Sequence, residues 1–282
     1  MAPDDIAVAR AVLGVEVEAN VLRDGVAVDL FVTAEAAGRQ AELRERLAAR
    51  PIDIVVQPRA GRRKRLFLAD MDSTMIEQEC VDELADFVGL KREVSAITER
   101  AMRGEIAFEP ALRERVALLR GLPVATIDTI MAERITLTPG GRVLIATMKR
   151  NGARTCLVSG GFTLFTGPVA GLLGFDENRA NRLSLDGDRL AGTVAEPILG
   201  REAKRATLLE LGERLGIAPA DALAVGDGAN DLAMLEVAGM GVAFHAKPAV
   251  AAAARARIDH GDLTALLYIQ GYAAEDWAGG TA

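Results

Sequence analysis

The sequence predicts an α/β protein with a parallel sheet at its centre, and three short stretches predict it. Residues 66–69, 155–158 and 222–225 are runs of mostly apolar residues. Runs of this kind are typical of strands that are buried on both faces, as they are in parallel sheets. Each run ends abruptly at polar residues or glycine, and helix-length segments lie between the runs. We therefore expect strands that alternate with helices.

The composition fits this class and limits the partners. A chain of 282 residues is long enough for one large or two ordinary domains with a substantial core. Half of the residues are hydrophobic and only 4% are aromatic, which fits a helix-rich α/β protein. The formal net charge is −7, so nothing suggests a nucleic-acid partner.

The cysteines and the hydropathy pattern predict a cytoplasmic protein. Cys80 and Cys156 lie far apart without metal-ligand spacing, so we read them as free thiols in a reducing compartment. No apolar stretch reaches membrane-spanning length, and no basic segment precedes an apolar core at the N-terminus. His245 and His260 lack partners at metal spacing and are expected to be ordinary loop histidines.

Residues 1–61 are predicted to form a small N-terminal α+β module. Alternating apolar residues predict strands at 15–21 and 26–32, followed by a helix at 34–49 and a strand at 52–56. Two interpretations of this module stay open. It is either a packing or dimerisation module, which would make the protein a homodimer, or a remnant of an amino-acid-sensing, ACT-like domain.

Residues 62–282 are predicted to form the second domain, after a basic run at 59–65 that we read as a solvated boundary. Four helices follow the first strand, and Gly or Pro lies close to each predicted end. Their predicted ranges are 75–88, 91–102, 108–119 and 125–135. Four helices inserted directly after a strand-end loop predict a helical cap over a site, at about residues 76–136.

Two carboxylates follow the predicted strand at residues 66–69. Asp70 ends the apolar run, and Asp72 comes two residues later. Open α/β sheets bind ligands at the carboxyl ends of their strands, and a buried carboxylate needs a partner or a metal. Our hypothesis is that Asp70 is a nucleophile and metal ligand, with Asp72 as the acid and base. Residues 72–74 can also simply cap the next helix, with Glu77 at capping-box distance from Thr74.

Polar residues also follow the other two strands. Ser159, Gly160 and Gly161 offer a hydroxyl and accessible backbone N–H groups, which suit a phosphate, although a glycine turn before a helix would look the same. Residues 226–231 form a second acidic cluster between glycines. Lys204, near the start of a helix at 202–215, is either a solvated charge or a cation aimed at an anion.

These strand ends together suit phosphoryl transfer to a carboxylate. Parallel strands place their carboxyl ends at the same edge of the sheet. A cluster of carboxylates repels an anionic substrate unless a divalent cation neutralises it, and an all-oxygen site suits Mg²⁺. A carboxylate nucleophile that accepts a phosphoryl group is a known form of covalent catalysis.

The four stretches, in this order, resemble the motifs of the haloacid dehalogenase-like phosphatases, and among them the phosphoserine phosphatases most closely. They are residues 70–74 (Asp-Met-Asp-Ser-Thr), 159–161, Lys204 and residues 226–231. Two further stretches point to the phosphoserine phosphatases within this family. They are Glu79, within Ile-Glu-Gln-Glu-Cys-Val-Asp-Glu-Leu, and the segment 102–116. The resemblance runs from about residue 65 to about residue 268. It implies a Rossmann-like three-layer core with an inserted cap.

The resemblance also implies roles for individual residues. Asp70 would attack phosphorus and form an aspartyl-phosphate, and Asp72 would protonate the leaving oxygen and then deprotonate water. One Mg²⁺ per chain would be held by the side chains of Asp70 and Asp227 and the backbone carbonyl of Asp72, with Asp231 in support. Four groups would bind the phosphoryl oxygens: Ser159, Gly160, Lys204 and Asn230.

The implied substrate is the small molecule O-phospho-L-serine, which is hydrolysed to L-serine and phosphate in the last step of serine biosynthesis. Glu79 would pair with the substrate ammonium, Arg115 would bind its carboxylate, and Met102 and Phe108 would form an apolar wall. Two alternatives stay open. One is a phosphatase or phosphotransferase for another small phosphate, such as phosphohomoserine, and the other is a non-catalytic phosphate-binding regulator.

Overall fold

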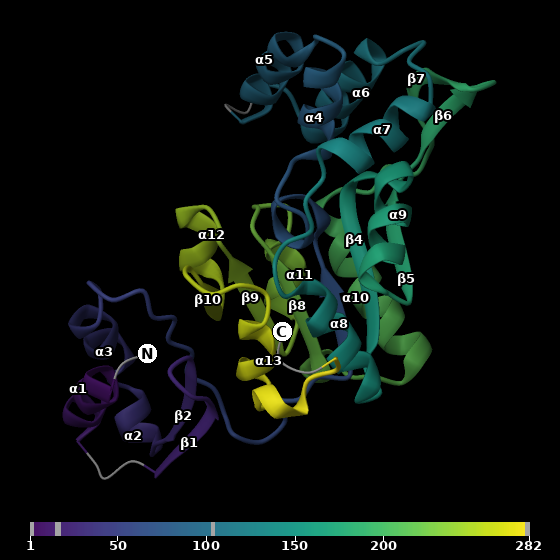
Figure 1. The fold of residues 1–282 in the computed structure, drawn as a ribbon. Helices are drawn as coiled ribbons and strands as arrows, with labels where there is room; N and C mark the ends of the chain where they lie inside the picture. Colours follow the sequence, from purple (N-terminus) through teal and green to yellow (C-terminus); the bar gives the residue numbers. More distant parts are fainter. Residues whose placement is uncertain (1–2, 15–17, 103–104, 280–282) are drawn as a thin grey trace.

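The centre of the molecule is a six-stranded parallel sheet (Figure 1). A computed structural model describes residues 3–14, 18–102 and 105–279. The strand order is β10-β9-β8-β3-β4-β5, and every neighbouring pair is parallel. The strands are β3 (Leu66–Ala69), β4 (Arg154–Phe162), β5 (Glu177–Asn181), β8 (Ala222–Gly226), β9 (Met240–Phe244) and β10 (Ala256–Ile258). The predicted parallel α/β class is confirmed, and β3 lies between β4 and β8.

Alternate residues of β3 enter two different hydrophobic cores, which gives the three layers. Phe67 packs with residues of α8 (Gly141–Arg150), α9 (Thr163–Leu173) and α13 (Ala265–Ile269). Leu68 packs with α10 (Arg201–Leu215), α11 (Leu232–Val237) and α12 (Pro248–Ala253) on the other face. Successive side chains of a strand point to opposite faces, so a strand that is apolar throughout requires helices on both sides.

Four helices form a separate layer beyond the carboxyl end of β3, at the top of Figure 1. They are α4 (Cys80–Phe87), α5 (Lys91–Met102), α6 (Phe108–Leu118) and α7 (Ala125–Glu133). The predicted start of the first helix at residue 75 is wrong. Met71–Met75 instead forms a π-helical turn in which Ser73 has a φ of 54°, and extended backbone separates this turn from α4.

An antiparallel hairpin joins this helical layer. It consists of β6 (Leu183–Asp186) and β7 (Arg189–Val194). The Gly121 N–H donates to the Leu190 carbonyl at 2.8 Å, and the Val124 N–H donates to the Asp188 carbonyl at 2.8 Å. The helical layer is therefore connected to the core by the hairpin as well as by its own two chain crossings.

The N-terminal segment has its own small apolar core but differs from the predicted β-β-α-β order. It contains α1 (Pro3–Leu13), β1 (Glu18–Arg23), β2 (Ala27–Phe31), α2 (Ala34–Ala37) and α3 (Gln40–Arg46). The helix at α1 was not predicted, the single helix at 34–49 is two helices, and part of the first predicted strand, residues 15–17, lies outside the described residues. The predicted strand at 52–56 is wrong, because among the described residues it takes no sheet partner.

Polar side chains connect the N-terminal segment with the C-terminal part of the core. The Asp53 carboxylate accepts hydrogen bonds from the N–H groups of Asp259 at 2.7 Å and Gly261 at 2.8 Å. The Arg62 guanidinium binds both carboxylate oxygens of Asp29 at 2.8 Å and donates to the Tyr268 carbonyl. The prediction of a wholly solvated basic run is therefore wrong at Arg62.

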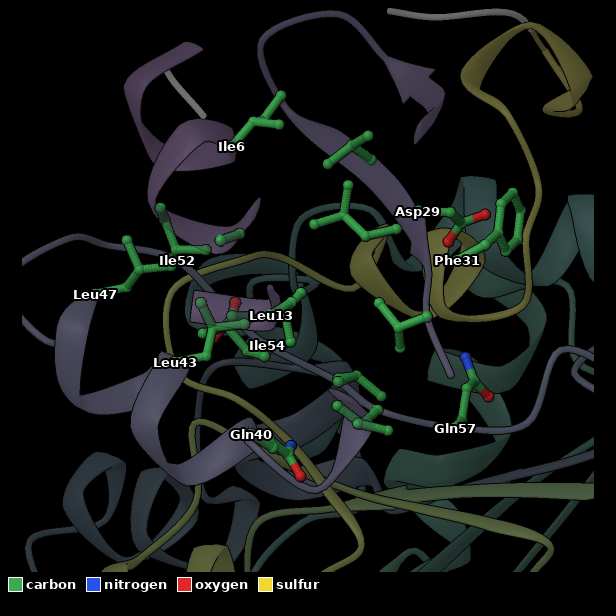
Figure 2. A pocket seen from close by; sticks show the side chains of 18 of the residues that line it. Ile6, Leu13, Asp29, Phe31, Gln40, Leu43, Leu47, Ile52, Ile54 and Gln57 are labelled. Atoms are coloured by element: carbon green, nitrogen blue, oxygen red, sulfur yellow. The ribbon is translucent and has the colours of Figure 1, made fainter. Parts of the chain in front are cut away.

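Figure 2 shows a pocket of about 210 Å³ inside this N-terminal segment. Apolar side chains such as Ile6, Leu13, Leu43 and Ile54 line most of it. None of the strand-end carboxylates of the sheet lines it, so the predicted chemistry lies elsewhere.

Candidate active site

Three neighbouring strands bring the predicted polar residues to one place. Asp70 follows β3, Ser159 lies within β4, and Asp227 follows β8. One carboxylate oxygen each from Asp70, Asp227 and Asp231 lies within 4.8 Å of the others, and all three residues are buried. Sequence-distant residues meet here because parallel strands end at the same edge of the sheet.

Lys204 is the cation of this cluster. It comes from the first turns of α10 and is only 1% exposed. Its Nζ lies 2.7 Å from Asp70 Oδ1 and 2.6 Å from Asp231 Oδ1. Burial by itself lowers the pKa of Lys204, but the two carboxylates outweigh it and hold that pKa above its ordinary value. The lysine is thus charged and compensates buried carboxylates that would otherwise be costly.

The oxygens of the three carboxylates are not equally available. Asp231 uses Oδ1 for Lys204 and accepts from the Gly228 N–H with Oδ2 at 3.1 Å. Asp70 uses Oδ1 for Lys204 and the Met71 N–H, at 2.7 and 2.8 Å. Among the described residues, Asp70 Oδ2 receives no hydrogen bond. Both oxygens of Asp231 are therefore engaged in hydrogen bonds that stabilise the cluster, whereas Asp70 Oδ2 is available to contact a ligand.

The cluster fits a hard divalent cation. Burial first, and the neighbouring Asp70 second, raise the pKa of Asp227, so this carboxylate lacks sufficient positive charge in its surroundings. A cation would supply that charge. The nearby protein ligands are oxygens alone, which suits Mg²⁺ rather than a metal that prefers nitrogen or sulfur. The buried triad of Asp70, Asp227 and Asp231 therefore offers oxygen ligands for such a cation.

Asp72 is held between the core and α4. Its Oδ1 accepts from the Cys80 N–H at 3.0 Å, and its Oδ2 accepts from Ser159 Oγ at 3.3 Å. Burial first, and Asp70 second, raise the pKa of Asp72 to about 6. A carboxyl group with this pKa can both release and accept a proton near neutral pH.

The Ser159-Gly160-Gly161 segment is extended backbone inside β4, so the strand continues past its predicted end at residue 158 and the alternative of a glycine turn does not hold. Ser159 Oγ accepts from the Gly161 N–H at 2.8 Å. A β-carbon at Gly161 would lie 3.2 Å from Asp72 Oδ2, so glycine allows the Asp72 carboxylate to lie close to β4 here. The Asn230 side chain is exposed and lies directly beside Gly228.

The helical layer contributes Glu79, Arg115 and Phe108. Glu79 accepts from Ser73 Oγ at 2.8 Å. Solvent reaches its side chain, yet many protein atoms crowd the carboxylate, and burial followed by Asp72 raises the pKa of Glu79 to about 7. Burial lowers the pKa of the half-buried Arg115, with Asp82 and then Glu79 opposing this effect.

Phe108 reaches across to the core. Its ring atoms lie 3.7 Å from the position of a β-carbon on Gly160 and 3.6 Å from that on Gly200. This contact places an apolar side chain of α6 directly over the Ser159–Gly161 segment. Met102 ends α5, but its side chain lies outside the part of the chain that the structure describes.

Two residues that contact the site were not assigned to it from the sequence. Thr74 Oγ1 donates to Asp227 Oδ1 at 3.4 Å, although the sequence suggested only a capping role. Asn181, at the end of β5, is buried and binds the Gly160 carbonyl at 2.8 Å. No spacing or motif in the sequence marks Asn181, because its partners are backbone atoms of distant segments.

The cysteines and the helix lengths concern two further expectations. Cys80 and Cys156 are free, as predicted, and both are buried. Within the described ranges, none of the helices has the length and apolar character that crossing a bilayer would require.

Comparisons with known proteins agree with this geometry. Residues 67–236 match the haloacid dehalogenase-like hydrolase family. A phosphoserine phosphatase of Albidiferax ferrireducens is 50% identical over 208 residues, which cover 72% of this chain and 88% of that protein.

Two solved structures are also similar to this chain. A HAD family hydrolase from Salmonella enterica serovar Typhi has a TM-score of 0.86 and 29% identity, covering 95% of this chain and 94% of that one. A structure described as a phospho-aspartyl intermediate analogue of phosphoserine phosphatase has a TM-score of 0.67 and 39% identity, covering 73% of this chain and 98% of that one.

Proposed function

Because this chain belongs to the haloacid dehalogenase-like hydrolases, we propose that it is a phosphoserine phosphatase, which hydrolyses O-phospho-L-serine to L-serine and phosphate. The observation that carries this proposal is the contact of Lys204 Nζ with Asp70, 2.7 Å away, beside the acidic residues Asp227 and Asp231. The similarity to proteins named phosphoserine phosphatase supports the choice of substrate. This hydrolysis would be the last step of serine biosynthesis, as the sequence suggested.

The first chemical step is attack by Asp70. Its Oδ2 forms a bond to phosphorus while the bond from phosphorus to the serine oxygen breaks. Asp72, protonated on a carboxyl group whose pKa is about 6, gives its proton to that leaving oxygen. L-serine leaves, and an aspartyl-phosphate remains on Asp70.

The second step reverses the role of Asp72. As a carboxylate it takes a proton from water, and the water oxygen attacks phosphorus. The bond between phosphorus and the Asp70 oxygen breaks, which releases phosphate and restores the carboxylate. Asp72 is held for both steps by the Cys80 N–H and Ser159 Oγ.

The phosphoryl group needs positive charge and hydrogen-bond donors. We assign this binding to Ser159, the Gly160 N–H, Lys204 and Asn230. Asp70 and Asp227, with the backbone carbonyl of Asp72, would hold Mg²⁺, and Asp231 supports them through Lys204 and Gly228. Mg²⁺, when bound, supplies charge that neutralises the carboxylates and the phosphoryl oxygens.

Selection of the amino acid falls to the helical layer. Glu79 pairs with the substrate ammonium, and Arg115 binds the substrate carboxylate with its guanidinium. Phe108 covers Gly160 and excludes water from the phosphoryl group, and we keep Met102 in the same apolar wall. Among the described residues, Arg115 takes part in no ion pair, so it is available for a carboxylate.

The organisation of the molecule is part of the proposal. We propose that residues 1–61 are a separate module, with residues 62–282 as the catalytic domain and 76–136 as its cap. The separate apolar core of the N-terminal segment supports this division. We also propose a cytoplasmic homodimer, with the buried thiols in support of a reducing compartment.

A phosphate-release assay tests the function. O-phospho-L-serine is compared with phosphohomoserine, phosphothreonine and p-nitrophenyl phosphate, with Mg²⁺ and with EDTA. We expect the highest kcat/KM for O-phospho-L-serine, with loss of activity in EDTA and in Asp70→Asn. A higher kcat/KM for another metabolite phosphate would move the assignment to that substrate, and activity that survives in Asp70→Asn would contradict the mechanism.

A further inference from the structure

The backbone of β4 departs from regular pairing where the phosphoryl-binding residues lie. Val158 pairs with Arg179 of β5, and the next pair is Phe162 with Asn181. Four residue steps along β4 therefore oppose two steps along β5. Ser159–Gly161 therefore oppose the single residue Ala180 and form a bulge, and a bulge leaves backbone groups without ladder partners.

The Asn181 side chain takes the place of a ladder partner for this bulge. Its Nδ2 donates to the Gly160 carbonyl at 2.8 Å. Gly160 is partly buried, and a carbonyl shielded from water needs a partner, so this hydrogen bond fixes the orientation of the peptide group between Gly160 and Gly161. Asn181 is 1% exposed, so water cannot easily replace it.

The same side chain binds the segment that leads into α10. Nδ2 also donates to the Leu199 carbonyl at 3.2 Å, and Oδ1 accepts from the Leu199 N–H at 2.6 Å. Gly200 follows and is the N-cap of α10, which carries Lys204. One amide therefore uses both of its donors and its acceptor to join the bulge to the start of the lysine helix.

Phe108 connects this arrangement with the cap. Its ring lies over Gly160, which Asn181 binds, and over Gly200. Gly200 follows Leu199, the other residue that Asn181 binds. The two glycines form one surface for the ring only if β4 and the start of α10 keep their spacing. The hydrogen bonds of Asn181 set that spacing.

From this geometry we infer that Asn181 is a positioning residue, which holds the peptide group between Gly160 and Gly161, next to the one that carries the Gly160 N–H, and the start of the Lys204 helix in register for binding of the phosphoryl group. The inference rests on the proposed function, because it assigns to Asn181 the support of groups that bind the phosphoryl oxygens. Asn181 does not touch the substrate and acts through Gly160 and Leu199.

The test uses Asn181→Asp in the full-length chain. Aspartate has the same size and keeps an acceptor for the Leu199 N–H, but it loses both N–H donors and faces two carbonyl oxygens with a carboxylate. Asn178→Asp is the matched control. It makes the same change on the same strand, and the Asn178 Oδ1 acceptor for Thr166 Oγ1 is retained.

We expect Asn181→Asp to lower kcat/KM for both O-phospho-L-serine and p-nitrophenyl phosphate by a similar factor, of about tenfold or more. The inhibition constant for inorganic phosphate should rise in parallel. Asn178→Asp should stay within about twofold of the wild type in all three quantities. A residue with a purely structural role would lower the melting temperature and leave phosphate binding by the folded enzyme unchanged.

Three results would overturn the inference: wild-type phosphate inhibition in Asn181→Asp, an equal loss in Asn178→Asp, or a loss confined to O-phospho-L-serine. If Asn181→Asp does not fold, Asn181→Ser replaces it with the same expectations, and failure of both variants to fold would assign Asn181 to stability alone. Failure of the proposed function is seen separately, in the wild type. If the wild type prefers another substrate, Asn181→Asp and Asn178→Asp can still be compared with p-nitrophenyl phosphate. If neither substrate is hydrolysed, the two variants are compared by calorimetric binding of inorganic phosphate.

Discussion

Lys204 Nζ lies 2.7 Å from Asp70 Oδ1, although 134 positions separate the two residues in the sequence (204 − 70 = 134). Both side chains are buried, and Asp231 is the second partner of the lysine. The contact joins the end of β3 to α10. The buried charge of the proposed nucleophile is therefore compensated by a lysine from a different element of the fold. Several measurable consequences come from this pair and its surroundings.

Removal of the lysine charge should destabilise the protein. Lys204→Met leaves the carboxylates of Asp70 and Asp231 buried without their cation, so we expect a loss of about 3–5 kcal/mol in the free energy of unfolding. Urea denaturation without added metal measures it. Lys149→Met is the control, because the ion pair of Lys149 with Asp176 is partly exposed and should contribute less than about 1 kcal/mol. Equal effects of the two substitutions would contradict the compensating role of Lys204.

Removal of the Arg115 guanidinium should affect amino-acid substrates only. Arg115→Ala should lower kcat/KM for O-phospho-L-serine by roughly a hundredfold, mainly through KM, because the substrate carboxylate loses its charged partner. Hydrolysis of p-nitrophenyl phosphate, which has no carboxylate, should be almost unchanged. Arg113→Ala, on the same helix but paired with Glu196, serves as the control. A similar loss for both substrates would remove Arg115 from substrate selection.

The affinity for O-phospho-L-serine should depend on pH through Glu79. Because burial and Asp72 raise the pKa of Glu79 to about 7, the carboxyl group is mostly neutral at pH 6 and mostly ionised at pH 8. Only the ionised form pairs with the substrate ammonium, so KM should fall as the pH rises through 7. Steady-state kinetics of the wild type and Glu79→Gln measure this effect. Glu79→Gln should have a higher KM that varies little over this range, and an unchanged slope would exclude Glu79 as the titrating group.

Replacement of Asp72 should separate the two chemical steps. In Asp72→Asn neither the general acid nor the general base is present, so we expect kcat for O-phospho-L-serine to fall by about 10²–10⁴. The leaving group of p-nitrophenyl phosphate needs no proton, so its first step should proceed while hydrolysis of the aspartyl-phosphate is slow. Stopped-flow absorbance should then show a burst of nitrophenolate that approaches the concentration of Asp70. A slow linear trace from the start would show that Asp72 does not act in the second step.

The fold and the catalytic cluster could be predicted because both depend on local patterns. The strand before Asp70 is an uninterrupted apolar run, and polar residues follow it at once, so both the strand and its carboxyl end can be recognised. The cluster then follows from the common direction of parallel strands. Lys204 needed the additional resemblance to a family, since a lysine near a helix start is usually solvated.

The remaining features depend on contacts that no local pattern records. Asn181 and Asp53 bind backbone groups of distant segments, and a backbone partner leaves no trace in the residue types. The start of α4 was misplaced because Ser73 adopts a positive φ, which serine rarely does. Arg62 was read as solvated because its partner, Asp29, lies in a different part of the chain.

The central claim is that the carboxylate of Asp70 carries the phosphoryl group during turnover. Acid quenching of the enzyme during hydrolysis of radiolabelled O-phospho-L-serine, followed by peptide mapping, tests it most directly. The account predicts one labelled peptide, with the phosphate on Asp70. Label on another residue, or turnover without any labelled protein, would contradict it.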